Sequence, residues 1–163
     1  MKILGIDPGL ATIGYGVIEE REHSYKPIDY GIISTPAGVS LPKRLKMIYD
    51  SMEELISRFA PDEIAFEELF FNKNVKTALS VAHARGVLVL AAMNSGREMF
   101  EYTPLQVKQA IVGYGRADKH QVQHMVMTLL GLSGIPKPDD AADALAIAIC
   151  HSHSKRFTNQ FKI

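Results

Sequence analysis

Little in the sequence points to a membrane or a secreted protein. The uninterrupted apolar runs are far shorter than the ~20 residues that a transmembrane helix needs. The opening residues, MKILGI, lead straight to Asp7 without the pattern of a signal peptide. The one cysteine, Cys150, lies in an apolar stretch, so an intrachain disulfide and a cysteine metal cluster are both excluded. We therefore expect a cytoplasmic protein with no membrane partner.

Net charge is also lacking, since 18 basic residues balance 18 acidic ones. Most nucleic-acid-binding domains are clearly basic, so this balance alone argues against such a partner. The charges are unevenly distributed, however: residues 1–70 hold 12 acidic and 7 basic side chains, and residues 71–163 hold 6 acidic and 11 basic ones. A basic second half can bind an anionic substrate, although chance scatter of surface charge explains the asymmetry equally well.

The chain has the length and apolar content of one domain with a sizeable core. Short apolar runs at residues 2–7, 15–19 and 30–35 predict three strands that form an antiparallel meander. Two later strands are predicted at residues 63–69 and 98–103. Apolar residues at three- and four-residue steps predict helices between and after them. We expect these helices at residues 41–60, 77–93, 104–112, 119–130 and 139–153.

This order of elements predicts one α/β domain over residues 1–154. Residues 155–163 form a C-terminal tail that has too little pattern for an element and is a candidate for disorder. The helix at residues 77–93 is apolar around most of its circumference. Such a helix is typically either deeply buried or partly covered by another subunit.

Two acidic motifs stand where predicted strands end. Asp7 follows an apolar strand within GIDPG at residues 5–9, and Glu67 closes another within AFEELF at residues 65–70. A carboxylate there is costly to bury in its ionised form without a cation or several donors. Because strand side chains alternate, only one of Glu67 and Glu68 can face a site inside the fold. Each motif also has an ordinary explanation, as a turn-capping aspartate or as solvated acids.

A third acidic motif, DDAADALA at residues 139–146, opens the last predicted helix. Asp140 and Asp143 share a helical face, and so do Asp139 and Asp143. Acids are common in a first helical turn, where they complement the helix dipole. Together the three motifs offer four oxygen ligands, a set that selects hard cations such as Mg²⁺ or Mn²⁺. Two such ions can activate water and stabilise the leaving oxygen during phosphodiester hydrolysis.

These motifs resemble the three acidic motifs of the RuvC family, the bacterial Holliday junction resolvases. Further matching stretches follow in order: QVKQ at residues 106–109, VG at 112–113 and KHQVQHMV at 119–126. The likeness covers roughly residues 2–153. It implies an RNase H-like α/β fold whose mixed five-stranded sheet, with three antiparallel strands first and two parallel strands after them, is flanked by helices.

The resemblance also implies an activity, that of a crossover junction endodeoxyribonuclease in homologous recombination and DNA repair. A homodimer with two Mg²⁺ per subunit, or Mn²⁺ as a substitute, would make paired symmetric nicks in four-way DNA junctions. Two-metal-ion hydrolysis would leave 5′-phosphate and 3′-hydroxyl ends. The RuvA and RuvB branch-migration complex is the implied protein partner.

Residue by residue, the resemblance assigns four metal-binding catalytic acids, choosing Glu67 over Glu68 and Asp140 over Asp139. These acids are Asp7, Glu67, Asp140 and Asp143. It places two basic residues, Lys108 and Lys119, where they would grip or polarise the scissile phosphate. It suggests that Phe70 stacks on or wedges between bases where the strands exchange. Further candidate DNA contacts, each with solvated surface charge as the default alternative, are Lys73, Lys76, Arg85 and Arg116.

Two other classes of protein share part of this pattern. Actin-like ATPases and sugar kinases have a similar opening turn, but they need a second lobe, for which the chain is too short. A non-catalytic junction-binding module would share the fold, although the complete set of acids argues against it. Metal-dependent cutting of a synthetic junction separates these classes. His120 and His124 lie one helical turn apart, but no third and fourth ligands for zinc accompany them.

Overall fold

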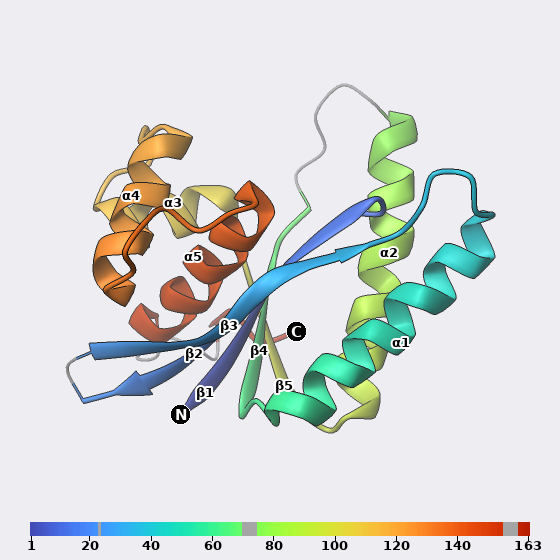
Figure 1. The fold of residues 1–163 in the computed structure, drawn as a ribbon, viewed down its shortest axis with the longest axis horizontal. Coiled ribbons are helices and arrows are strands. Elements are labelled where there is room, and N and C mark those ends of the chain that lie inside the picture. Colours follow the sequence, from blue (N-terminus) through green and yellow to red (C-terminus); the bar gives the residue numbers. More distant parts are fainter. Residues whose placement is uncertain (23, 70–74, 155–159) are drawn as a thin grey trace.

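A five-stranded sheet separates two layers of helices in the computed structural model, which describes residues 1–22, 24–69, 75–154 and 160–163 (Figure 1). The strands are β1 (Lys2–Asp7), β2 (Thr12–Arg21), β3 (Ser24–Ser34), β4 (Glu63–Glu67) and β5 (Glu98–Tyr102). The helices are α1 (Leu41–Phe59), α2 (Val75–Asn94), α3 (Pro104–Val112), α4 (Lys119–Leu130) and α5 (Asp139–His153).

The strand order across the sheet is β3-β2-β1-β4-β5. The first three strands pair antiparallel, whereas β4 pairs parallel to β1 and β5 parallel to β4. The expected mixed sheet is therefore confirmed. The β2–β3 hairpin is longer than predicted, because cross-strand pairing extends it through polar residues that have little strand propensity of their own.

Side chains of each strand alternate between the two helical layers. In β1, Leu4 and Ile6 join a core cluster with α1 and α2, while Ile3 joins a second cluster with α3, α4 and α5. The same alternation in β4 directs Glu67 toward the α5 layer and Glu68 toward the α2 layer. Figure 1 shows these two layers on opposite sides of the sheet.

Helix α5 lies unusually close to the sheet, and 11 of its 15 residues are buried. Glycines on β1 and β2 make this approach possible. A Cβ atom added at Gly5 would lie 2.1 Å from the Ala144 carbonyl oxygen, and one at Gly14 would lie 2.0 Å from the Asp140 carbonyl oxygen. At Gly16 it would lie 2.8 Å from the side chain of Leu145. The backbone of α5 therefore rests directly on glycine backbone.

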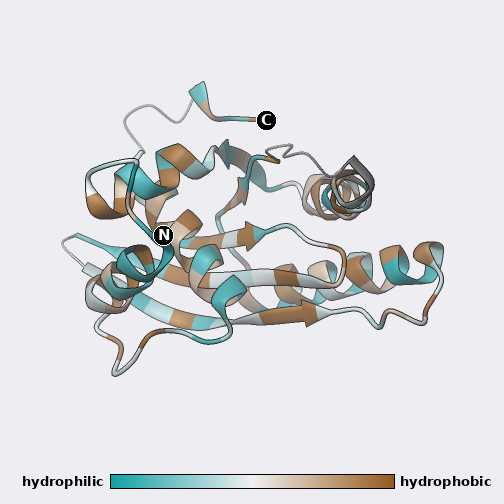
Figure 2. Ribbon diagram, turned by 90° about the horizontal axis from the view of Figure 1, so that it is seen from above, coloured by the Kyte–Doolittle hydropathy of each residue, from teal (hydrophilic) through white to brown (hydrophobic). Residues whose placement is uncertain are grey.

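The two helices of the opposite layer differ in character. Helix α1 alternates hydrophobic and hydrophilic residues along its length (Figure 2) and buries one apolar face. Helix α2 packs Ala84 and Leu88 toward the sheet but leaves Leu79, Leu90 and Met93 more than half exposed. By length and composition alone, its segment Thr77–Asn94 could cross a membrane, and only 22% of that segment is buried. Deep burial, one of the two explanations expected for this helix, therefore does not apply.

The end of the chain returns to the sheet beside β5. The Glu101 amide donates to the Phe161 carbonyl at 2.8 Å, and the Ile163 amide donates to the Met99 carbonyl at 3.0 Å. The Phe161 ring also lies 4.9 Å from the Tyr102 ring. Residues 160–163 thus cover part of the outer edge of β5, while residues 155–159 lie outside the described part of the chain.

The glycine contact predicts the effect of adding one methyl group. We expect Gly14→Ala to lower the free energy of unfolding by about 1–3 kcal/mol, because its Cβ would push against the backbone of α5. Gly134→Ala is the control, since a Cβ there meets no atom within 4 Å. Urea unfolding should leave the control within about 0.5 kcal/mol of the wild type. Equal stability of the two variants would refute the close contact.

Candidate active site

The four predicted acids come from three elements that meet at one edge of the sheet. Asp7 ends β1, and Glu67 ends the adjacent parallel strand β4, so both emerge at the same edge. Asp140 and Asp143 lie in the first turns of α5. Asp7 pairs in register with Gly14, the residue on which the Asp140 backbone rests. The close packing of α5 therefore brings its acids to the strand ends.

The turn after Asp7 is held by the segment that leads into α1. The Thr35 hydroxyl donates to the Leu10 carbonyl at 2.5 Å, and the Arg44 Nε donates to the Thr35 hydroxyl at 2.8 Å. The Thr35 amide also donates to the Ala11 carbonyl at 3.0 Å. These bonds fix the loop that follows the strand-end aspartate.

The electrostatics show that the acids influence one another. Burial raises the pKa of Asp7 from its ordinary 3.8 to about 8, and the charges of Glu67, Asp143 and Asp140 contribute to the rise. Burial, followed by the charge of Asp143, raises the pKa of Glu67 to about 7. The pKa of Asp143 is raised as well, mainly by burial. Without a counter-charge, these acids cannot all be fully ionised at neutral pH.

Two lysines provide positive charge beside the acids. The Lys119 Nζ lies 2.9 Å from Asp143 Oδ2 and 3.7 Å from Asp139 Oδ2. Lys108 is close enough to Glu67 to lower its pKa. Both lysines line a pocket of about 220 Å³ with Glu67 and Asp143. The rest of its lining is apolar: Pro104, Val107, Val122 and Ala146.

Lys119 is held in place by the start of α4, whose first residue it is. Asp118 and Gln121 form a reciprocal capping box there, in which the Gln121 amide donates to Asp118 Oδ1 at 2.8 Å and the Asp118 amide donates to Gln121 Oε1 at 2.9 Å. The helix predicted at residues 119–130 is thus confirmed, and this capping box marks its start.

Of the two alternative acids, Glu68 lies apart from this group, whereas Asp139 lies 3.7 Å from the Lys119 Nζ. Glu68 lines a different hollow, of about 310 Å³, with Arg85 and Glu101. Asp139 is paired with Lys137 at 2.8 Å on the outside of the first turn of α5. The geometry thus separates the neighbours Glu67 and Glu68, as the alternation of strand side chains predicts.

The chemistry of the group fits hard divalent cations, because every donor is a carboxylate oxygen and their mutual repulsion is what a cation relieves. Within the described ranges, however, no three Asp, Glu, His or Cys side chains stand close enough to form a ready-made metal site. Lys119 is paired with Asp143 instead. Ion binding would therefore require the acids to draw together.

The residues that were expected to contact DNA lie in different surroundings. Phe70 and Lys73 lie outside the described residues, as does the side chain of Lys76 in the first turn of α2. Arg116 is exposed between α3 and α4, three residues before Lys119. Arg85 forms an ion pair with Glu101, and only 24% of its side chain is exposed. Its guanidinium is thus already engaged with a carboxylate.

Sequence reasoning missed two features around the site. One is the close packing of α5 on the glycines of β2, whose spacing of two places them on one strand face and which the alanines of α5 match in size. The other is His151, which the structure buries completely. A polar residue inside an otherwise apolar helical run was the signal available for it.

Carboxylates from two parallel strand ends and a helix, beside two lysines on a mixed sheet, define the class of metal-dependent nucleases with an RNase H-like fold. The chain belongs to the RuvC family: the family model described as crossover junction endodeoxyribonuclease RuvC matches residues 3–151. Members of this family are metal-dependent nucleases that act on DNA.

Individual relatives agree over the whole chain. The crossover junction endodeoxyribonuclease RuvC of Alkaliphilus oremlandii is 61% identical over 163 residues, which are 100% of this chain and 99% of that protein. The solved structure of Thermus thermophilus RuvC superposes with a TM-score of 0.91 at 34% identity and covers 100% of both chains. A T. thermophilus RuvC in complex with Holliday junction substrate gives 0.90 at 32% identity, covering 100% of this chain and 99% of that one.

The raised pKa of Asp7 predicts how stability depends on pH in the absence of metal. The folded protein binds the Asp7 proton more tightly than the unfolded chain does, so this contribution is full below about pH 4 and is lost as the pH rises through about 8. We expect Asp7→Asn to melt above the wild type at pH 8 in chelator, by roughly 2–4 °C for each kcal/mol of relieved repulsion. The gap should close toward pH 4.

The matched control is Glu22→Gln, an exposed acid in the β2–β3 turn. It should show no such pH-dependent gap in thermal melts. A wild type that gains stability between pH 4 and pH 8 relative to Asp7→Asn would contradict the assigned repulsion.

Proposed function

We propose that this chain resolves four-way DNA junctions by metal-dependent hydrolysis of phosphodiester bonds, with Asp7, Glu67, Asp140 and Asp143 as metal ligands. The observation that carries the proposal is the meeting of these acids beside two lysines in a chain that the RuvC family model matches over residues 3–151. The T. thermophilus RuvC complex with Holliday junction substrate supports the choice of substrate.

Two Mg²⁺ ions, with Mn²⁺ as a substitute, would activate water and stabilise the leaving oxygen, giving 5′-phosphate and 3′-hydroxyl ends. The residues of the chain supply the rest. The four acids would bind the metal ions and orient them. Lys108 and Lys119, which line the same pocket as Glu67 and Asp143, would donate to the non-bridging oxygens of the phosphate and offset its developing charge.

Helix α2 supports a two-fold dimer as part of this proposal. Five of its exposed residues recur at alternating steps of four and three, the spacing of helices that pair along an apolar seam. They are Leu79, His83, Gly86, Leu90 and Met93. A membrane span is disfavoured, since Arg85 would lie near its middle, where a charge is costly. A two-fold dimer presents two equal sites to a junction of approximate two-fold symmetry.

Further residues are candidates for DNA contacts. Arg116, exposed beside Lys119, is the supported candidate for a further phosphate contact, whereas the ion pair of Arg85 with Glu101 argues for a structural role. Phe70, Lys73 and Lys76 remain candidates from the sequence alone. We also propose that the chain acts in the cytoplasm together with RuvA and RuvB in recombination and repair, as the family resemblance implies.

The neighbouring glutamates of β4 give the sharpest test of activity. We expect Glu67→Gln to lower Mg²⁺-dependent cutting of a synthetic four-way junction by at least about 100-fold, since even partners behind a metal ligand typically contribute 10–100-fold. Glu68→Gln, the matched control on the other face, should stay within a few-fold of the wild type. Junction binding without metal should persist in both. Equal loss in the two variants would overturn the assignment.

The dimer has its own test in two leucines of equal exposure, Leu90 on α2 and Leu105 on α3, both 54% exposed. Leu90→Asp places a charge in the proposed seam and should convert the dimer to a monomer in analytical ultracentrifugation. Leu105→Asp should leave the dimer intact. A dimer that survives the first substitution would place the subunit interface elsewhere.

A further inference from the structure

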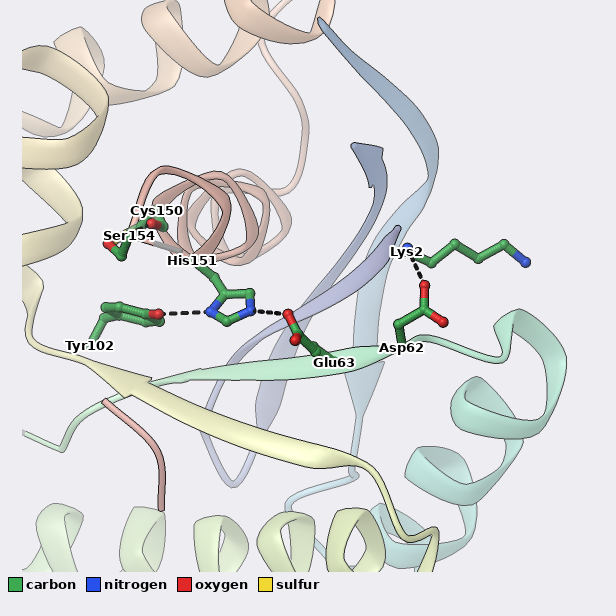
Figure 3. A network of polar contacts seen from close by, with 7 residues as sticks. All are labelled: Lys2, Asp62, Glu63, Tyr102, Cys150, His151 and Ser154. Carbon is green, nitrogen blue, oxygen red and sulfur yellow. Dashed lines mark hydrogen bonds and ion pairs between the residues drawn. The ribbon is translucent and has the colours of Figure 1, made fainter. Parts of the chain in front are cut away.

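His151 connects α5 to two strands from a fully buried position. Its Nδ1 lies 2.7 Å from the Tyr102 hydroxyl of β5, and its Nε2 lies 2.6 Å from Glu63 Oε2 of β4 (Figure 3). The Phe100 ring packs against the imidazole with 4.4 Å between ring centroids. Both ring nitrogens are thus engaged, and the bridge spans three elements.

The direction of these hydrogen bonds follows from the partners. An ionised carboxylate only accepts, so the His151 Nε2–H donates to Glu63. If the ring is neutral with its proton on Nε2, Nδ1 accepts from the Tyr102 hydroxyl, whose pKa is raised by burial. Each partner therefore holds the imidazole in one tautomer and one orientation.

The bridge and the catalytic acids lie at matching positions along the same helix and strand. Asp143 of α5 and Glu67 of β4 line one pocket, while His151 and Glu63 are bonded at the other end. Asp143 and His151 are eight helical residues apart, about 12 Å. Glu63 and Glu67 are four strand residues apart, about 13 Å. Because α5 runs antiparallel to β4, the two contacts join the same helix and the same strand at two points along their length.

Close packing alone does not set this alignment. The sheet-facing surface of α5 places Ala144 and Ala148 on the backbone of Gly5 and the Leu145 side chain on Gly16. These van der Waals contacts set how near the helix lies, but each of them is weak and non-directional. Hydrogen bonds are directional and fail when the helix shifts or rotates. The bridge therefore adds a directional restraint on the position of α5 along β4.

We propose that His151, held by Glu63 and Tyr102, is a positioning residue for cleavage: it fixes α5 along β4 and thereby the spacing of Asp143 and Glu67. This inference rests on the proposed role of those two acids as metal ligands. It assigns His151 no contact with DNA or metal, since it acts only through the helix and strand that carry the ligands.

The test measures metal affinity directly, by calorimetric titration of Mn²⁺ into the intact protein without DNA. His151→Phe keeps a ring but removes both hydrogen bonds, and Tyr102→Phe removes only the hydroxyl. We expect both to weaken Mn²⁺ binding, by about 10-fold or more for His151→Phe, as for residues that orient metal ligands. His151→Gln, with one amide donor and one acceptor, should recover part of the affinity. Junction affinity in chelator should stay within about two-fold.

The control is Ile149→Val, a fully buried change on the same turn of α5 that leaves the bridge intact. It should lower thermal stability without weakening Mn²⁺ binding. Wild-type affinity in His151→Phe and Tyr102→Phe would overturn the proposal, and so would equal weakening in Ile149→Val. If His151→Phe does not fold, Tyr102→Phe decides. A wild type that neither binds Mn²⁺ nor cuts a junction would refute the proposed function itself.

Discussion

Repulsion between carboxylates that share a partly buried edge is the constraint on which this structure depends. Asp7 carries the clearest sign of it, a pKa raised to about 8 by burial and by three neighbouring acids. Isolated acids would move toward water and away from one another. The fold holds them by anchoring each on a rigid element: two parallel strand ends and one helix. The proposed metal site makes use of this repulsion, because a divalent cation would relieve it.

The two faces of the sheet carry different groups of residues. On the α5 side, small residues bring helix and strands close enough to assemble the acids, and the pocket with its two lysines opens there. On the α2 side, Glu68, Arg85 and Glu101 form a separate polar group, and an apolar stripe remains exposed. Alternation along β4 is what assigns two adjacent glutamates to these different surroundings. One residue of register shift would exchange their places.

Much of this could be predicted from the sequence, and what could not has a physical reason. Helix and strand positions followed from apolar periodicity, because this signal is local. The ends of the β2–β3 hairpin did not follow, since cross-strand pairing stabilises them. The choice of Glu67 over Glu68 needed the family resemblance. The bridge at His151 joins residues 88 positions apart, so no local pattern shows it.

The return of residues 160–163 to β5 has a consequence for assembly. The outer edge of a sheet carries unpaired amides and carbonyls, which invite a strand from a neighbouring molecule. Here the end of the chain occupies part of that border itself, with Phe161 and Ile163 satisfying groups of β5. Residues 160–163 thus cover part of one exposed sheet edge, which disfavours strand addition from another molecule there. Association through a helical seam can then stop at two copies.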